Sequence, residues 1–200
     1  MPSLPETHVT LESDLPLWDR FFTVAPLVLV GTREPDGGHD LAPKHMATPL
    51  SWDRWWGFVC SPTHRTWHNA LRTKQFTVSY VPPHGFLQAT LAAGPRSDEG
   101  KPTLQAVPVV EASVVDGVLA AGCDIYLECE VDRVVEGLGD NGLIIGRVVA
   151  AHAHRDALRA DDRDDADLLT ERPLLAYAHP LRFAPVAATT AFPLHEGFKK

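Results

Sequence analysis

The sequence contains few cysteines, and none of them forms a pair with a spacing typical of metal or redox sites. Cys60, Cys123 and Cys129 are odd in number, include no Cys-x-x-Cys pair and stand in apolar surroundings. Such a set is typical of reduced, buried thiols in the cytosol and argues against a disulfide framework or a zinc site. We therefore expect no disulfide, no bound metal and a cytoplasmic protein.

Long apolar runs and an excess of basic charge are also missing. No run approaches the roughly 20 apolar residues that a membrane-spanning helix needs, and the first residues lack the basic and apolar regions of a signal peptide. With 18 Lys and Arg against 26 Asp and Glu, the formal net charge is −8. A nucleic-acid-binding surface would need a basic stripe. We expect neither a membrane nor a nucleic acid as partner, although this charge allows a local basic pocket.

A glycine-rich dinucleotide fingerprint is absent after the first apolar strand, residues 26–31, which argues against a Rossmann-type site. The apolar runs are short and end at turn signals such as Asp36-Gly37-Gly38. Only the stretches 66–73 and 86–93 have a clear helical pattern. Short strands joined by turns favour a mainly β protein with an antiparallel barrel and a few short helices.

The length of 200 residues fits one domain with a core of its own. We expect an N-terminal arm over residues 1–23, the domain over residues 24–185 and a tail over residues 186–200. The charge-dense segment 155–172 is expected to form a solvated helix or loop without a functional role. A turn is expected over residues 137–142.

The turn after the strand 55–60 concentrates hydrogen-bond donors and cations. Ser61, Thr63, His64, Arg65 and Thr66 lie between that strand and the first helical stretch. A helix that begins here has unpaired backbone N–H groups at its start, and together with hydroxyls and a guanidinium they can hold a phosphate. Ser and Thr before a helix can instead be plain N-caps, and the sequence leaves both interpretations open.

Five motifs follow one another along the chain: Asp40-Leu41-Ala42-Pro43-Lys44-His45, His64-Arg65-Thr66-Trp67-His68-Asn69, Gln75-Phe76-Thr77-Val78-Ser79, Leu127-Glu128-Cys129 and Gly146-Arg147-Val148-Val149-Ala150-Ala151-His152. In this order they resemble the flavin reductase-like FMN-binding split-barrel family, over roughly residues 24–183. The resemblance rests on the ordered set, because no single motif is specific. It implies a Greek-key-like antiparallel split β-barrel.

The resemblance also implies a function. It indicates an FMN-binding oxidoreductase, either an NAD(P)H:flavin reductase or the reductase component of a two-component flavin monooxygenase. FMN (possibly FAD) is the implied cofactor and NADH or NADPH the implied co-substrate. Such proteins are homodimers with the flavin near the subunit interface, and many pass reduced flavin to a partner monooxygenase.

The site residues follow from the same resemblance. Backbone groups of five residues would line the edge of the isoalloxazine ring: Ala42, Pro43, Lys44, His45 and Met46. The ribityl phosphate would be held by Ser61, His64, Arg65 and Thr66, with Asn69 bracing the turn. His152 would lie on the nicotinamide side and is the implied catalytic residue. Arg65 can donate two hydrogen bonds to one phosphate, which Lys cannot.

The sequence departs from the family pattern at several positions, including His64-Arg65 in place of Lys-Asp and Arg147 in place of Glu. Asp40 stands in place of Asn, and an acidic side chain near the flavin pyrimidine would disfavour the reduced, anionic form. His45 stands in place of Ser and either hydrogen-bonds the flavin or fills space.

Two other functions stay open. The chain could be an FMN-binding protein without efficient turnover. It could also be a metal-dependent enzyme that uses His152 and His154, which project from one face of the expected strand. No third ligand is evident near that pair in the sequence.

Overall fold

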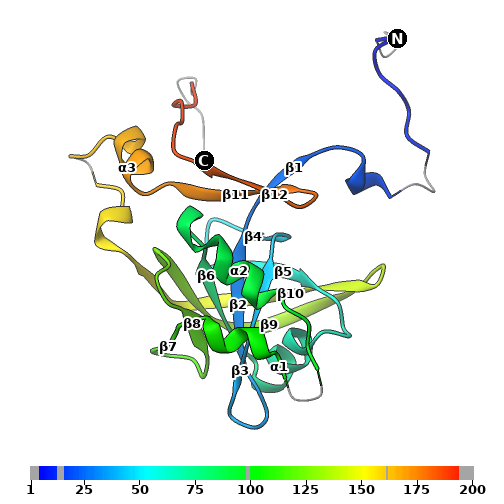
Figure 1. Ribbon diagram of the computed structural model, residues 1–200, viewed down its shortest axis with the longest axis vertical. Coiled ribbons are helices and arrows are strands. Elements are labelled where there is room, and N and C mark those ends of the chain that lie inside the picture. The colour runs from blue at the N-terminus through cyan, green and yellow to red at the C-terminus, as the bar shows by residue number, and fades with distance from the viewer. Residues whose placement is uncertain (1–4, 13–15, 98–99, 161, 194–200) are drawn as a thin grey trace.

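The structure is a computed structural model that describes residues 5–12, 16–97, 100–160 and 162–193. Its main body is a curled, seven-stranded antiparallel sheet (Figure 1). In the order in which they pair, the strands are β3 (His39–Lys44), β2 (Val28–Arg33), β6 (Gln75–Tyr80), β9 (Ile125–Leu138), β10 (Asn141–Ala153), β5 (Trp55–Cys60) and β4 (Ala47–Pro49).

The curl follows from the connection between the two edge strands. β3 and β4 lie at opposite edges of the sheet, yet only His45 and Met46 separate them in the chain. Two residues bridge roughly 10 Å at most, so the edges must meet at this corner. The expected antiparallel barrel is confirmed, and we call this corner the seam.

A smaller sheet lies above the barrel in Figure 1. It pairs β1 (Thr23–Pro26), β11 (Leu174–His179) and β12 (Arg182–Val186), and a two-stranded ribbon consists of β7 (Val109–Glu111) and β8 (Val118–Ala120). The α-helices are α1 (Arg65–Thr73), α2 (Phe86–Ala92) and α3 (Asp165–Glu171). The 3-10 helices are η1 (Leu17–Asp19), η2 (Pro83–Gly85), η3 (Pro102–Ala106) and η4 (Arg155–Ala157).

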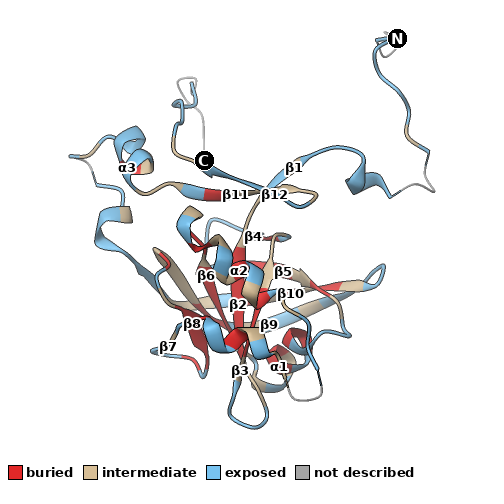
Figure 2. Ribbon diagram, in the orientation of Figure 1, coloured by how far each residue is buried: buried red, intermediate tan, exposed pale blue. Residues whose placement is uncertain are grey.

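The main core lies inside the barrel, where Figure 2 shows buried residues concentrated on the strands. Trp56, Phe58 and Phe76 are at most 1% exposed and pack ring against ring. Burial of a large apolar side chain contributes roughly 1.5–3 kcal/mol. α1 closes one side of this core through Trp67 and Ala70, three residues apart on one helical face.

The hairpin of β9 and β10 is longer than the sequence indicated. The turn expected over residues 137–142 is present but shorter than expected, because β9 extends to Leu138 and β10 begins at Asn141. Most side chains in the outer part of β9 are exposed. The apolar alternation that marks a half-buried strand is therefore lost there, although the strands still pair.

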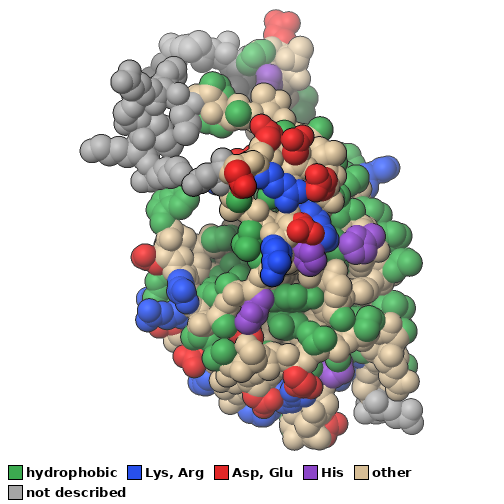
Figure 3. Space-filling model, turned by 90° about the vertical axis from the view of Figure 1, so that its left-hand side faces the viewer, with side chains coloured by type: hydrophobic (Ala, Val, Ile, Leu, Met, Phe, Trp, Pro, Cys, Tyr) green, Lys and Arg blue, Asp and Glu red, His purple; other side chains and the backbone are tan. Residues whose placement is uncertain are grey.

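The charge-dense segment 155–172 forms η4 and α3, as a solvated segment should. Figure 3 faces the side on which α3 lies and shows acidic and basic side chains interspersed in its upper half. Arg159 pairs with Asp165 at 2.7 Å, and Arg172 pairs with Asp156 at 3.2 Å. Exposed pairs of this kind contribute little to stability.

The three cysteines are free and buried, as expected. Burial raises the pKa of the Cys123 thiol to about 12, so this thiol stays protonated and unreactive. Among the described residues, no helix combines the length and apolarity needed to cross a membrane.

Candidate functional site

The seam carries the motif that the sequence singled out around Pro43. β3 pairs only with β2 and leaves its other side free, so Pro43, which has no N–H group to donate, lies on an edge strand. The outer side of β3 is satisfied in part by a side chain, since Lys101 Nζ donates to the Leu41 carbonyl at 2.9 Å. β3 thus forms one wall of a site that other segments complete.

The turn before α1 forms the second wall. Ser61 and Thr63 bond each other, with their hydroxyl oxygens 2.9 Å apart, and the Thr63 N–H donates to Ser61 Oγ at 3.3 Å. His64 occupies the N-cap position in an extended conformation, and no side chain caps the helix. Plain N-capping by Ser or Thr is therefore wrong, and the first turn of α1 keeps N–H groups that a ligand can use.

These two walls enclose a cavity of about 430 Å³, which we call the basic cavity. Four cations line it, Lys44, Arg65, Arg96 and Lys101, against the single carboxylate of Asp40. In a protein of net charge −8 this local excess of positive charge favours an anionic ligand. Six of the residues expected to bind the cofactor line the cavity: Ala42, Pro43, Lys44, His64, Arg65 and Thr66.

Asp40 is the electrostatic centre of this cavity. It is 2% exposed and accepts hydrogen bonds from Thr66 Oγ1 and Arg96 Nη2, both at 3.0 Å, and lies 3.1 Å from Lys101 Nζ. Burial alone would raise the pKa of Asp40, but the charge and hydrogen bond of Lys101, then Thr66 and Arg96, outweigh it and lower the pKa. Asp40 is therefore ionised, and the cations of Arg96 and Lys101 beside it offset its negative charge.

Arg96 and Lys101 line the basic cavity, although no pattern in the sequence pointed to them. They flank a short irregular stretch after α2, without periodicity or a known motif, and they reach the site only through the fold. Lys101 also has a structural role, because its Nζ donates to the Ala92 carbonyl at 2.7 Å. Arg96 Nη2 bonds Glu34 at 2.8 Å as well as Asp40.

His64 enters the cavity as a neutral group. Burial, followed by the charge of Lys44, lowers its pKa. Lys44 Nζ lies 3.5 Å from Cys60 Sγ. His64 can thus donate or accept one hydrogen bond without adding charge.

Other expected residues lie beside the basic cavity rather than in it. His45 lines two neighbouring cavities of about 410 and 670 Å³, and Met46 lines the second of them. Asn69 lies on the buried face of α1, where its Nδ2 donates to Thr32 Oγ1 at 3.2 Å, so it holds the helix against β2. Ser61 does not line the basic cavity, but its hydroxyl bonds that of Thr63, which does.

His45 packs against two rings from β11. Its ring centroid is 4.7 Å from that of Tyr177 and 5.3 Å from that of His179, with an interplanar angle of 13° to the latter. Burial, then His179 and Lys44, lowers the pKa of His45. His45 therefore packs against rings of its own chain, and it also lines both neighbouring cavities, so a contact with the flavin stays a prediction.

His152 lies outside this group of residues. It pairs with Tyr126 across the β9–β10 ladder, and its Nε2 is 2.8 Å from Glu128 Oε1. His154 does not share its strand, because β10 ends at Ala153 and His154 caps η4 instead. Among the described residues, no group of three His, Cys, Asp or Glu side chains could hold a metal ion. The expectation that His152 and His154 project from one face of a strand is therefore wrong.

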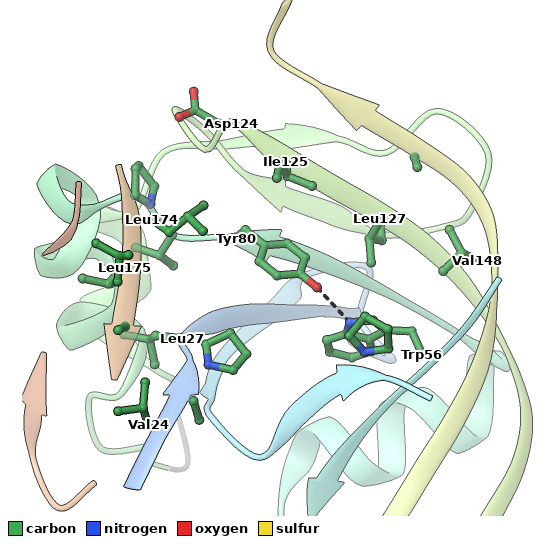
Figure 4. Close-up of a pocket in the computed structure, with 18 of the residues that line it drawn as sticks. Val24, Leu27, Trp56, Tyr80, Asp124, Ile125, Leu127, Val148, Leu174 and Leu175 are labelled. Carbon is green, nitrogen blue, oxygen red and sulfur yellow. Dashed lines mark hydrogen bonds between the residues drawn. The ribbon is translucent and has the colours of Figure 1, made fainter. Parts of the chain in front are cut away.

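A separate cavity of about 750 Å³ lies between the small sheet and the barrel, and none of the expected site residues lines it. Figure 4 shows apolar side chains from β1 and β11 on one side and from β9 and β10 on the other. In its wall, Trp56 Nε1 donates to the Tyr80 hydroxyl at 3.0 Å. The mainly apolar lining does not suit a phosphate, so the basic cavity remains the candidate anion site.

Comparison with known proteins gives a consistent result. The family model described as "Flavin reductase like domain" matches residues 21–182. A split-barrel-domain protein from Shewanella frigidimarina has a TM-score of 0.76 at 15% identity, covering 86% of this chain and 87% of that one. An FMN-binding protein from Thermus thermophilus has a TM-score of 0.75 at 21% identity, covering 93% and 99%. The NADH:FAD oxidoreductase SgcE6 from Streptomyces globisporus has a TM-score of 0.69 at 16% identity, covering 90% and 98%. These structures confirm the split-barrel fold.

Proposed function

The chain belongs to the flavin reductase-like domain family, and on this premise we propose that it is an NAD(P)H:flavin reductase or the reductase component of a two-component flavin monooxygenase. The observation that carries the proposal is the basic cavity at the seam. Four cations and the uncapped start of α1 converge there in an otherwise acidic protein. This donor set fits a phosphate that carries close to two negative charges.

In this proposal the chain binds and orients the flavin, and the flavin supplies the hydride chemistry. Arg65 and the N–H groups of α1 hold the phosphate. Pro43 and Ala42 extend from the basic cavity along β3 toward His45, so the ring system lies over the seam beside the two neighbouring cavities. No acid–base pair is required of the protein, which positions the reactants and excludes water.

A second copy of the chain completes the proposed site. Four large apolar residues that line the 670 Å³ cavity are exposed in the single chain: Trp18, Val24, Met46 and Leu50. A contiguous apolar surface of this kind suits burial against another protein surface. We assign His152 to the nicotinamide side of the assembled dimer, because it lies outside the basic cavity of its own chain and its side chain is 44% exposed.

The direct test of the proposed function is nicotinamide consumption. Purified protein with FMN or FAD is expected to oxidise NADH or NADPH, measured as loss of the absorbance of the reduced nicotinamide, at a rate that scales with protein concentration. Flavin binding without nicotinamide consumption would identify the chain as a flavin-binding protein without turnover. Activity that follows added metal in a colourless protein would contradict both.

Arg65→Ala tests the phosphate site. The guanidinium is 46% exposed, and its Nε lies 3.5 Å from Glu34, so its loss leaves the core intact. We expect FMN affinity to fall by about 1.5–3 kcal/mol, the usual contribution of a charge-assisted hydrogen bond. Isothermal titration calorimetry measures this loss.

Two controls accompany that titration. Riboflavin has no phosphate, so Arg65→Ala should leave its affinity unchanged. Arg147→Ala removes the same charge from an exposed position on β10 and should leave FMN affinity unchanged. An unaltered FMN dissociation constant in Arg65→Ala would remove Arg65 from the site.

A further inference from the structure

A larger polar cavity adjoins the basic cavity. It has a volume of about 1140 Å³, and we call it the outer cavity. Arg65, Arg96 and Lys101 line both cavities, so the two share a wall of cations. Apart from Arg65, the residues expected from the sequence to bind the cofactor are absent from its lining. A single phosphate in the basic cavity would leave the outer cavity without an occupant.

The shared wall has hydrogen-bonding capacity for more than one phosphate. Arg96 uses only Nη2 for Glu34 and Asp40, and its other two guanidinium nitrogens have no partner within the described part of the chain. Among the described residues, Arg65 has one ion-pair partner, Glu34, which lies 3.5 Å from its Nε. Two guanidinium groups with free donors at the boundary match the paired phosphates of a dinucleotide: Arg65 can donate two parallel hydrogen bonds from Nη1 and Nη2, and Arg96 can donate from Nε and from Nη1 to separate oxygens.

The chemistry of the lining changes beyond that wall. The outer cavity adds the carboxylates of Glu34 and Asp36, the imidazole of His39 and the amide of Gln105, beside the buried apolar side chain of Leu104. Asp36 uses Oδ1 for the Gly38 N–H at 2.9 Å, and its other oxygen is free to accept. Carboxylates accept hydrogen bonds from ribose hydroxyls, and amide and imidazole groups suit the edge of a base. Such a lining does not suit a third phosphate.

We propose that the outer cavity binds the adenosine part of FAD, so that the chain selects FAD over FMN. This inference rests on the proposed function and specifies its flavin. The pyrophosphate lies along the shared wall between Arg65 and Arg96, the flavin extends over the seam, and the ribose and adenine enter the outer cavity.

The test compares FAD with FMN on the full chain by isothermal titration calorimetry. We expect FAD to bind at least about tenfold more tightly. Gln105→Trp places an indole in the outer cavity from an exposed position. It should weaken FAD binding by about tenfold and leave FMN binding unchanged. Ala106→Trp adds the same side chain at the next exposed residue, outside the lining, and should change neither affinity.

The outcomes separate the inference from the proposed function. Equal affinities, or tighter binding of FMN, would overturn the selection of FAD and leave the flavin site in place. A preference for FAD that Gln105→Trp does not alter would overturn the assignment of the outer cavity. Failure to bind either flavin would overturn the proposed function, and this inference with it.

Discussion

Glu128→Gln is expected to lower the free energy of unfolding by about 3 kcal/mol. Glu128 is 0% exposed, and its carboxylate accepts backbone N–H bonds from Ser113, Val114 and Val115 at 2.6–2.9 Å. The Ser113 hydroxyl at 2.7 Å and His152 Nε2 at 2.8 Å complete its surroundings. Glutamine keeps the size but replaces one accepting oxygen by an NH2 group, which faces donors it cannot satisfy.

Urea unfolding measures this loss, and the chain offers a matched control. Glu130 lies two residues away on the same strand and is exposed, so Glu130→Gln makes the same chemical change without burial. It should shift the unfolding free energy by less than about 0.5 kcal/mol. Equal stability of the two variants would show that the Glu128 carboxylate does not hold the loop between β7 and β8.

The Glu128 carboxylate also makes the free energy of unfolding depend on pH. Burial alone would raise the pKa of Glu128, but the Ser113 hydroxyl and the three N–H groups outweigh it and lower the pKa from 4.5 to about 2. The unfolded state therefore binds a proton first as the pH falls. This contribution to stability is fully present above about pH 4.5 and is lost progressively toward pH 2. Unfolding free energies measured over this range should fall less steeply in Glu128→Gln than in the unaltered protein.

Asp40→Asn is the second substitution with a large expected effect, again about 3 kcal/mol of unfolding free energy. It removes the carboxylate between Arg96 and Lys101, and the Lys101 side chain is only 11% exposed. Two cations then remain close together with Glu34 as the nearest described counter-ion, bonded to Arg96. Breaking a buried ion pair on one side is costly because the remaining charge stays desolvated.

The same substitution has an opposite effect on the ligand. Removing one negative charge from the lining of the basic cavity should strengthen FMN binding, because the phosphate then meets four cations without a carboxylate. Urea unfolding and calorimetric titration measure the two effects on one sample. Asp140→Asn, in the exposed turn between β9 and β10, makes the matched change and should alter neither. A variant as stable as the control would contradict the role given to Asp40.

Local patterns were sufficient to predict the parts of the site that are continuous in sequence. β6 begins at Gln75, the first residue of the third motif, and α1 begins one residue before the helical pattern. The turn at Asp36-Gly37-Gly38 forms with Gly37 at a φ of 87°, which glycine adopts without strain. In each case the signal lies within a few neighbouring residues.

Features that depend on contacts between residues far apart in the sequence could not be predicted from local patterns. Arg96 and Lys101 meet Asp40 only because the chain after α2 returns to the outer side of β3. The surroundings of His152 depend on the β9–β10 register, which shifts at three places. Each shift changes the face on which later side chains lie, so counting alternate residues along the strand cannot place His152.

The two edges of the seven-stranded sheet have a consequence for behaviour at high concentration. An exposed edge strand is a template for pairing between molecules. Here β3 carries Pro43 and Lys44, and β4 has only three residues and ends at Pro49. Proline lacks the N–H group that a foreign strand would need, and a lysine charge resists docking. The protein should therefore stay free of fibrillar, cross-β aggregation when concentrated, even with the flavin site empty.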